Sequence, residues 1–407
     1  MKTILIELCR DFTEIDSRGK GKGMKVIYVF SDSPIEWNCS EWRMHAPSDA
    51  INWNAENNPE YTGWSAKMIH ITGFLDYLDT TIQNHIAPAD IIIVQRNVIT
   101  TEAIDARRYW IGMGKPVAID LDDMYQRLPW SNPAHAFWIE NSANLDPAPL
   151  DMLERGLQTC NALISPNRNL LNDWSHVARG YYLQNYARKE WWLNDVSRHE
   201  QKSKLGLENK IVIGWGGSVS HYDSWWGSGL RDAASQICKT YPDVVWMICG
   251  SDPRILDQLD VPDRNKYAQP GVYPEFWPDV VKTFDIGVAP LYGMYDQRRS
   301  WIKSLEYGLA GTPWIATDGE VYSNFTGYGK LVKGGVTNWF NAISSTIDNL
   351  YVLQQKSESL VSYYQQYFAV NQMKTFGKIY SSIIENYKAD YGSLPGLNFV
   401  NWGKGNE

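Results

Sequence analysis

Short apolar runs alternate with amphipathic stretches along most of the chain. Runs such as 25–30 (KVIYVF), 90–94 (DIIIV) and 244–249 (VVWMIC) have the length of strands and show no polar face, which is typical of strands buried on both sides of a parallel sheet. In stretches between such runs, apolar residues recur every three or four positions, as on one face of a helix. This alternation predicts an α/β fold in which helices connect parallel strands through right-handed crossovers.

The predicted strands fall into two series, which a polar and charged stretch at 186–209 separates. The first series comprises 25–30, 90–94, 117–121, 162–165 and 181–183, and the second comprises 211–214, 244–249, 286–291, 313–317 and 330–332. We therefore expect a first domain over 1–190, a linker over 191–209, a second domain over 210–365, and a C-terminal helix and tail over 366–407.

Four segments give weaker patterns. Residues 1–24 begin apolar and continue into a loop rich in Gly and Lys, which is compatible with an added edge strand. Residues 51–63 have the composition of a polar excursion, and the apolar spacing in 64–83 predicts one long helix. Residues 392–407 are expected to be a frayed tail.

Composition describes a globular chain with room for two domains. Its 407 residues suit two domains of about 200 residues each, and its 44% hydrophobic and 21% charged content is typical of globular proteins. No apolar run reaches the roughly 18 residues of a membrane span, and charged residues interrupt the N-terminal segment where a signal peptide would be apolar. The five cysteines stand far apart, which disfavours disulfides and structural zinc. We expect a cytoplasmic protein without stable membrane insertion.

Charge and aromatic content bear on the kind of ligand. The formal net charge of −8 argues against broad nucleic-acid binding, although it is compatible with a local basic cleft. The chain also carries 19 Trp and 24 Tyr residues. This excess suggests stacking surfaces, for which sugars and bases are both candidates. Most of the rings are nevertheless expected in the core or at its rim.

The stretch 285–318 combines the predicted fold with candidate chemistry. Apolar runs at 286–291 and 313–317 predict two buried parallel strands. Between them, apolar residues at three- and four-residue spacing predict a helix, with Ser300 as its N-cap and Gly311 at its end.

Basic residues gather where this predicted helix begins. Arg298, Arg299 and Ser300 lie at or just before the first turn, and Lys303 follows one turn later. Cations at a helix N-terminus oppose the helix dipole, and a bound phosphate or diphosphate would resolve the conflict. Glu306 could then accept hydrogen bonds from ribose hydroxyls. Alternatively, these are solvated charges with a Lys303–Glu306 pair on the helix surface.

These residues resemble the motif of a known family. The run Tyr295-Asp296-x-x-Arg299-Ser300-x-x-Lys303-x-Leu305-Glu306-Tyr307, followed by Gly311-x-Pro313, is similar to the donor-site motif of glycosyltransferases with two facing Rossmann-like domains, the GT-B fold, and specifically of glycosyltransferase family 4 (glycosyl transferases group 1). In that family the helix N-terminus and nearby basic residues hold the nucleoside diphosphate, and the glutamate that matches Glu306 contacts the ribose. Many members carry a second glutamate eight positions earlier, near the donor sugar, but this chain has Arg298 there.

The resemblance implies both an architecture and a chemistry. The expected fold is α/β, with two facing Rossmann-like domains, a central cleft, and C-terminal helices that cross back to the N-terminal domain. The expected activity is that of a retaining, metal-independent hexosyltransferase whose co-substrate is a nucleoside-diphosphate sugar and which needs no cofactor. Arg299 and Lys303 would be catalytic, because preorganised positive charge stabilises a leaving diphosphate. Arg298 in place of the first family glutamate leaves retention or inversion open.

A glycine-rich loop opens the second domain. Glycines after a buried strand let the backbone approach a ligand closely, and this loop matches the one that faces the donor diphosphate in GT-B enzymes. The residues predicted to bind the donor are therefore Gly216, Gly217, Ser218, His221, Ser300 and Glu306. Val272 and Tyr273 join them, because 270–274 resembles the turn where GT-B enzymes place the nucleotide base.

Candidate residues of the first domain lie at strand ends. Arg43 belongs to a segment that resembles the Arg-x-x-x-Pro of relatives and could meet an acceptor or donor anion, although a surface ion pair is the commoner role. Arg96 follows the strand at 90–94, at the edge where open α/β sheets bind ligands.

An acidic cluster and an aromatic loop complete the candidate site. The strand at 117–121 ends in Asp120-x-Asp122-Asp123, a pattern open to a metal site, a catalytic base, an acceptor-hydroxyl binder or a turn cap. We predict Asp122 and Asp123 as catalytic, cleft-facing groups without a metal. The long loop at 125–147 is predicted to form an acceptor-binding lip, with His135 on the acceptor side.

The sequence therefore predicts a glycosyltransferase that moves a sugar from a nucleoside-diphosphate sugar to an acceptor hydroxyl. The acceptor is unknown: a glycan or lipid-linked saccharide is the default. A hydroxymethylated DNA base, the only form in which nucleic acid would be a partner, is an outlier. Two alternatives remain: a GT-B sugar-nucleotide epimerase, which needs no acceptor, and a noncatalytic sugar-binding protein.

Overall fold

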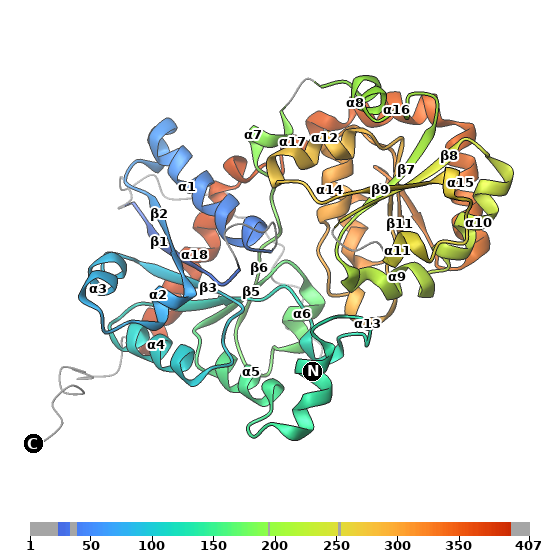
Figure 1. The fold of residues 1–407 in the computed structure, drawn as a ribbon. Helices are drawn as coiled ribbons and strands as arrows, with labels where there is room; N and C mark the ends of the chain where they lie inside the picture. Colours follow the sequence, from blue (N-terminus) through green and yellow to red (C-terminus); the bar gives the residue numbers. More distant parts are fainter. Residues whose placement is uncertain (1–22, 33–38, 194–195, 251–253, 392–407) are drawn as a thin grey trace, which may run out of the picture.

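Two α/β domains face each other in the computed structural model, which describes residues 23–32, 39–193, 196–250 and 254–391 (Figure 1). Each domain is built on one parallel sheet, as the two series of apolar runs predict, but each sheet has six strands rather than the five of its series. The strands that the series lack are at 65–70 and 266–269, each at an edge of its sheet. The frayed tail expected over 392–407 lies outside the described residues, and so does the edge strand considered over 1–24, except for residues 23 and 24, which belong to no strand.

The first sheet has the strand order β2-β1-β3-β4-β5-β6, with all neighbours parallel. Its strands are β1 (Lys25–Phe30), β2 (Ser65–His70), β3 (Ile91–Gln95), β4 (Val117–Asp120), β5 (Ala162–Ser165) and β6 (Gly180–Tyr182). The helices of this domain are α1 (Ala46–Asn57), α2 (Ile71–Leu75), α3 (Thr80–Ile86), α4 (Thr101–Gly112), α5 (Pro149–Gln158) and α6 (Arg168–Asp173). Every residue of β3, β4 and β5 is buried, which explains why these strands are apolar on both faces.

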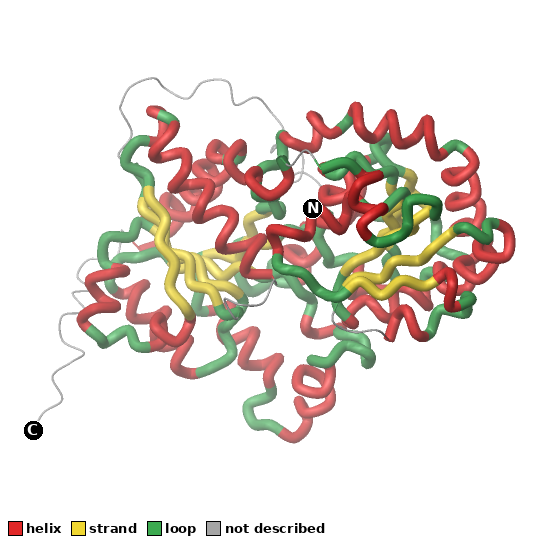
Figure 2. The backbone as a smooth tube through the Cα atoms, turned by 45° about the horizontal axis from the view of Figure 1, so that its top comes forward, coloured by secondary structure: helices red, strands yellow, loops and turns green. Residues whose placement is uncertain are grey.

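The second sheet has the order β12-β11-β10-β7-β8-β9 and is again parallel throughout. Its strands are β7 (Ile211–Gly216), β8 (Val244–Cys249), β9 (Lys266–Gln269), β10 (Ile286–Ala289), β11 (Trp314–Thr317) and β12 (Lys330–Val332). Its helices are α9 (Tyr222–Gly227), α10 (Leu230–Thr240), α11 (Arg254–Asp257), α12 (Trp277–Lys282), α13 (Gly293–Asp296), α14 (Ile302–Leu309), α15 (Val336–Asp348), α16 (Leu350–Ser359) and α17 (Val361–Gln365). Helices lie on both sides of each sheet (Figure 2).

Within the described residues, two segments connect the domains, and they run side by side. The first passes through α7 (Lys189–Trp192) and α8 (Arg198–Lys204), and the second leads into the long helix α18 (Met373–Tyr391). Ala187 bonds to both Tyr367 and Ala369 through backbone groups, at 3.1 and 2.8 Å. No described helix combines the length and the hydropathy that crossing a membrane requires.

Helix α18 packs on the first domain, which confirms the predicted return of the C-terminal helices. The Tyr380 hydroxyl lies 2.7 Å from the Tyr28 hydroxyl of β1, and Asn386 Nδ2 donates to the Tyr181 hydroxyl of β6 at 2.7 Å. Tyr28 and Tyr380 are both fully buried. The last helix is therefore part of the first domain's core.

Two predictions for the first domain were wrong. The expected polar excursion at 51–63 is largely the second half of α1, and the expected long helix at 64–83 is the edge strand β2 followed by α2 and α3. Apolar residues such as Met68, Ile71 and Phe74 recur at helical spacing across the strand–helix junction, which imitates one continuous helix. Parallel pairing of β2 with β1 is a tertiary contact that this local spacing does not reveal.

The strand order reverses beside β1 in the first sheet and beside β7 in the second. In open α/β sheets, ligands bind in the crevice outside the carboxyl ends of the strands at such a reversal. Asp122, after β4, and Gly217, after β7, line the same cavity. The carboxyl edges of the two sheets therefore face each other across one site.

Candidate active site

A cavity of about 370 Å³ lies between the two domains. The first domain contributes Cys39, Trp42, Arg43, Asp122, Asp123 and Asn185 to its lining. The second domain contributes Gly216, Gly217, Ser218, Cys249, Gly250, Trp277, Arg299, Ser300, Ile302, Lys303 and Glu306. The residues predicted from the sequence that do not line this cavity are His221, Val272, Tyr273, Arg96 and His135.

The strand–helix–strand unit predicted over 285–318 is present, and its helix opens onto the cavity. Strands β10 and β11, which precede and follow α14 in the chain, pair in parallel. The helix ends at Leu309, and Gly311, two residues later, has a φ of 64°. The prediction of Ser300 as N-cap was wrong, because the cap position is Trp301 and no side chain caps the helix. The Ser300 hydroxyl instead accepts a hydrogen bond from Asn185 Nδ2 of the first domain at 2.8 Å. The backbone amides of the first turn, which lack partners within the helix, remain near the cavity.

Lys303 and Glu306 project from α14 into the cavity and share a buried environment. Burial lowers the pKa of Lys303 to about 8, against the opposing effect of Glu306. Burial also raises the pKa of Glu306 to about 7, with Lys303 and a hydrogen bond from Trp277 acting against it. Lys303 Nζ donates to the Gly216 carbonyl, and Trp277 Nε1 donates to Glu306 Oε1 at 2.8 Å. A surface Lys303–Glu306 pair is therefore excluded, because Glu306 is only 3% exposed.

Gly216 allows Trp277 to reach this position. A Cβ atom built on Gly216 would lie 2.1 Å from the Trp277 ring, so any side chain there would displace the indole. The ring closes one side of the cavity and holds the Glu306 carboxylate through its N–H group. Sequence reasoning missed Trp277, because a tryptophan in the first turn of an amphipathic helix is usually a core residue.

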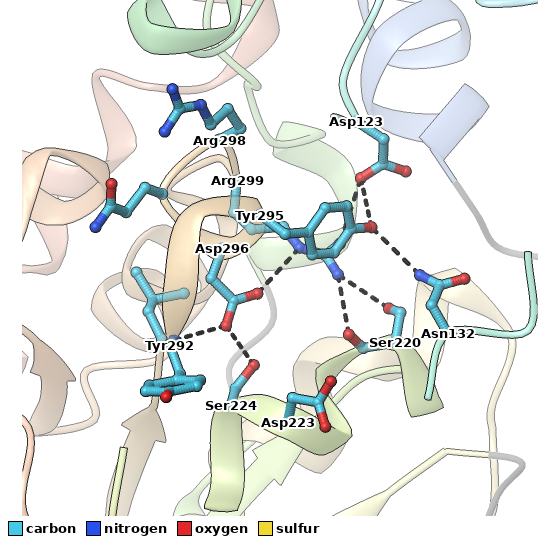
Figure 3. Close-up of polar contacts among 12 residues, drawn as sticks. Asp123, Asn132, Ser220, Asp223, Ser224, Tyr292, Tyr295, Asp296, Arg298 and Arg299 are labelled. Atoms are coloured by element: carbon cyan, nitrogen blue, oxygen red, sulfur yellow. Dashed lines mark hydrogen bonds and ion pairs between the residues drawn. The ribbon is translucent and has the colours of Figure 1, made fainter. Parts of the chain in front are cut away.

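Arg299 is held by groups from both domains (Figure 3). Its guanidinium lies 3.6 Å from Asp123 of the first domain and 3.7 Å from Asp296. It also lies over the Tyr295 ring, 4.5 Å from the ring centre, and donates to the Ser220 hydroxyl at 3.1 Å. Burial alone would lower the pKa of Arg299, but the oxygens of Tyr295, Asp123 and Asp296 raise it above its usual value. A permanent and preoriented positive charge therefore lines the cavity.

Tyr295 and Asp296 belong to the motif recognised in the sequence, yet the sequence suggested no role for either. The Tyr295 hydroxyl donates to Asp123 at 3.0 Å and thereby links the domains. Asp296 accepts from the Ser224 hydroxyl at 2.6 Å and from the Tyr292 amide at 2.7 Å. Both residues are buried, and both hold the Arg299 guanidinium: Tyr295 through its ring face and Asp296 through its carboxylate.

The acidic cluster after β4 separates into groups with different surroundings. Asp120 points into the interior, whereas Asp122 and Asp123 line the cavity. Burial and the neighbouring Asp123 raise the pKa of Asp122 to about 6, and its Oδ1 atom has no hydrogen-bond partner among the described residues. Arg96 holds a backbone φ of 30°, which costs free energy for a residue other than glycine. Its guanidinium pairs with Asp32 and lies 4.0 Å from Asp122.

Arg43 forms a buried ion pair with Asp120. The surface ion pair considered from the sequence was therefore wrong. Its Nε and Nη2 atoms donate to the two carboxylate oxygens of Asp120, each at 2.7 Å. Its Nη1 atom donates to the Leu183 carbonyl at 2.7 Å and to Asn185 Oδ1 at 2.8 Å. Arg43 thus lines the cavity, but its guanidinium already donates hydrogen bonds to groups of the protein.

Arg298, at the position of the first family glutamate, is directed away from the cavity. Its guanidinium forms two hydrogen bonds, at 2.8 and 2.9 Å, with the carboxylate of Asp173 in α6. Nearby, Asn167 donates to the carbonyls of Gln297 and Arg299 at 3.0 and 2.8 Å. These contacts tie the first domain to the segment that precedes α14.

The other predicted residues do not line the cavity. His221 packs edge-to-face with the Trp215 ring, and burial, together with Arg299 and Lys303, lowers its pKa well below the usual value. Val272 packs against the core and Tyr273 is 63% exposed. His135 Nδ1 lies 2.8 Å from the Leu128 carbonyl within the 125–147 loop. Among the described residues, no group of three His, Cys, Asp or Glu is placed to hold a metal.

Comparison of the sequence with protein-family models and with curated proteins finds no match. Comparison of the structure finds similar folds. Sucrose-phosphate synthase from Thermosynechococcus elongatus aligns with a TM-score of 0.60 at 12% identity, over 89% of this chain and 99% of the other. A glycosyltransferase from Rickettsia africae aligns with a TM-score of 0.60 at 11% identity, over 90% of this chain and 100% of the other.

A third similar structure was determined with a nucleotide sugar. Anabaena HepE in complex with UDP-glucose aligns with a TM-score of 0.54 at 14% identity, over 91% of this chain and 100% of HepE. Because all three identities are low, the similarity establishes the fold alone. The fold is GT-B, with two facing Rossmann-like domains, as the sequence predicts.

Proposed function

We propose that this protein is a glycosyltransferase that uses a nucleoside-diphosphate sugar as donor. The observation that carries the proposal is the cavity between the domains, where Arg299, Lys303 and the start of α14 surround one point and Glu306 lies one turn further along. A diphosphate would satisfy the cations and the free amides, and Glu306 would accept hydrogen bonds from the ribose. The resemblance of the 295–313 motif to family 4 supports a hexosyltransferase, for which we propose a first domain over 1–190, a linker over 191–209, a donor domain over 210–365, and a C-terminal helix and tail over 366–407.

Catalysis would be electrostatic. As the bond between the anomeric carbon and the diphosphate breaks, negative charge grows on the departing phosphate, and Arg299 and Lys303 would stabilise it without reorganising. Asp122, whose buried Oδ1 atom accepts no hydrogen bond among the described residues and whose pKa is raised, would accept a hydrogen bond from the acceptor hydroxyl and orient it. Retention at the anomeric carbon and metal independence follow from the family resemblance and remain part of the proposal.

Measuring the fate of the donor separates the candidate functions. A transferase releases nucleoside diphosphate, slowly with water and faster with the right acceptor. An epimerase instead isomerises the sugar nucleotide and releases no diphosphate from it at turnover rates, and a binding protein leaves the donor intact. We therefore expect diphosphate release from at least one of a panel of nucleotide sugars. A donor that binds but stays unchanged would contradict the proposal.

Replacing Glu306 is expected to weaken donor binding. Glu306→Ala removes a charged hydrogen-bond acceptor, so the Kd for the nucleoside diphosphate should rise by roughly 10- to 100-fold. Glu306→Gln keeps the shape and the acceptor for the Trp277 N–H group, and should fall between the wild type and the alanine variant. Isothermal titration with nucleoside diphosphates measures this, and equal affinity in all three proteins would remove Glu306 from the donor site.

Diphosphate affinity is also expected to depend on pH. Since the pKa of Lys303 is lowered to about 8, the side chain loses its positive charge as pH rises through that value, and the affinity for an anion falls. The terminal phosphate is already ionised there, with a pKa of about 6. Lys303→Arg keeps its charge at all accessible pH values, so its affinity should stay level above pH 8. The same decline in both proteins would assign the effect to another group.

A further inference from the structure

A groove of about 610 Å³ lies beside the cavity between the domains, which we now call the donor cavity. The 125–147 loop of the first domain contributes Arg127, Pro129 and Trp130, and the second domain contributes Ser220, Asp223, Ser224, Trp226, Gly227, Tyr292, Gly293, Met294, Tyr295 and Asp296. We call this feature the aromatic groove. It is not the nucleotide-facing cavity, since neither Lys303 nor Glu306 lines it.

Large apolar side chains are exposed along the aromatic groove. Trp130 is 75% exposed, Tyr292 is 57% exposed and Met294 is 50% exposed. Large apolar side chains that are exposed together in one hollow are typical of a binding surface, whereas single exposed residues are common everywhere. The Tyr292 ring packs directly on Gly227. A Cβ atom at this glycine would lie only 2.1 Å from the ring, so the absence of a side chain there allows the contact.

The polar groups of the aromatic groove are mainly hydrogen-bond acceptors. Asp223 accepts from the Ser131 hydroxyl across the domain boundary at 2.9 Å, and Asp296 accepts from Ser224 and from the Tyr292 amide. Asp296 is 3% exposed and already pairs with Arg299, so the ionised side chains that remain open to the groove are Asp223 and Arg127, whose charges balance. A ligand that carries phosphate or sulfate would find no excess of positive charge here, whereas a neutral ligand with many hydroxyl groups could donate to Asp223.

The residues that line the aromatic groove contact residues that line the donor cavity, as the polar contacts in Figure 3 show. Tyr295, Asp296 and Ser220 line the aromatic groove, and the same three residues hold Arg299, which lines the donor cavity. The Tyr295 hydroxyl reaches Asp123 in the donor cavity. A ligand in the aromatic groove would thus lie next to the group that faces the leaving diphosphate.

We propose that the aromatic groove binds a neutral oligosaccharide that serves as the glycosyl acceptor. The proposal rests on the transferase function above and names its acceptor class. The flat faces of sugar rings lie on Trp130 and Tyr292, sugar hydroxyls donate to Asp223, and the chain runs toward the donor cavity. Polynucleotide acceptors are disfavoured, because the groove offers their phosphates no excess of positive charge.

The test uses the full chain, fluorescently labelled, on an array of immobilised oligosaccharides that includes neutral hexose chains, phosphorylated chains and single-stranded DNA. Wild type should bind a subset of the neutral chains. Trp130→Ala and Tyr292→Ala should each weaken this binding about tenfold or more, as expected for the loss of one stacking ring. Gly227→Ala should act in the same direction, because it displaces the Tyr292 ring.

Matched controls separate this site from the donor site. Tyr351→Ala removes a tyrosine that is 72% exposed on α16, and it should bind saccharides as the wild type does. All variants should keep the wild-type rise in Tm with nucleoside diphosphates. If nucleoside diphosphates do not raise the Tm of the wild type, the donor site is rejected. If the wild type nevertheless binds neutral saccharides, the assignment of the aromatic groove as a saccharide site still holds.

Three results would overturn the assignment of the aromatic groove. These are the absence of binding to any neutral chain, a preference for phosphorylated chains or DNA, and unchanged binding in both Trp130→Ala and Tyr292→Ala.

Discussion

Arg299→Ala is expected to lower the turnover of donor by about 100- to 1,000-fold, the loss measured when one preorganised group that stabilises transition-state charge is removed. Arg299 is fixed by Asp123, Asp296 and Tyr295 before any ligand binds, so its charge is in place when the diphosphate departs. The fall should appear mainly in kcat, with a smaller rise in KM. Diphosphate release from a nucleotide sugar is the measurement.

Two controls accompany this experiment. Arg299→Lys keeps the positive charge but loses the planar guanidinium, and should recover part of the activity. Arg108→Ala removes an arginine whose side chain is 66% exposed on α4, and should leave turnover unchanged. Because Arg299→Ala leaves two carboxylates near each other, its Tm is compared with that of the wild type. A folded Arg299→Ala variant with wild-type kcat would exclude electrostatic catalysis by this residue.

Arg43→Ala is expected to destabilise the fold by about 3–5 kcal/mol, because it leaves a buried carboxylate without its cation. Asp120 is 3% exposed and receives two hydrogen bonds from Arg43. Burial already raises the pKa of Asp120, with Arg43 opposing the shift. Urea-induced unfolding, followed by circular dichroism, gives the change in the free energy of unfolding.

Arg108→Ala again serves as the control, since its exposed pair with Asp105 at 3.8 Å should contribute no more than about 0.5 kcal/mol. The double variant Arg43→Met/Asp120→Leu should be more stable than Arg43→Ala, because no unpaired charge remains buried. Equal stability of the Arg43→Ala and Arg108→Ala variants would show that the buried pair is not structurally important.

The parts of the fold that could be predicted from the sequence are those set by local pattern. The strands β3, β8 and β10 are buried on both faces, so their apolar runs are unbroken, and Gly311 marks the end of α14 with a positive φ. The edge strand β2 was missed because only one neighbour, β1, pairs with it. Its half-exposed pattern merges with that of the following helix.

The candidate site was predictable where a local motif carries it. The glycines at the end of β7 and the basic start of α14 come together in one cavity because they lie at the carboxyl ends of β7 and β10, neighbouring strands of the same sheet. The role of Trp277 was not predictable, because its indole reaches the cavity only through contact with Gly216, which lies 61 residues earlier in the chain. Likewise, the sequence does not reveal that Asp120 bonds to Arg43, 77 positions earlier, while Asp122 faces the cavity.

Arg298 shows how a departure from a family pattern can be explained by structure. A glutamate at this position would be expected near the donor sugar, but the arginine binds Asp173 of the first domain instead. The ion pair is interdomain, and its partner lies in α6, far along the chain. The sequence alone could report the departure but not its consequence.

The most direct test of the central claim is a thermal-shift measurement with nucleoside diphosphates and their sugars. A ligand that binds only the folded state raises the Tm, by an amount that grows with its concentration over Kd. The account predicts a rise that is specific for one base, present with the diphosphate alone, and reduced in Glu306→Ala. A folded wild-type protein whose Tm responds to none of these ligands would contradict the assignment of the cavity as a nucleotide-sugar site.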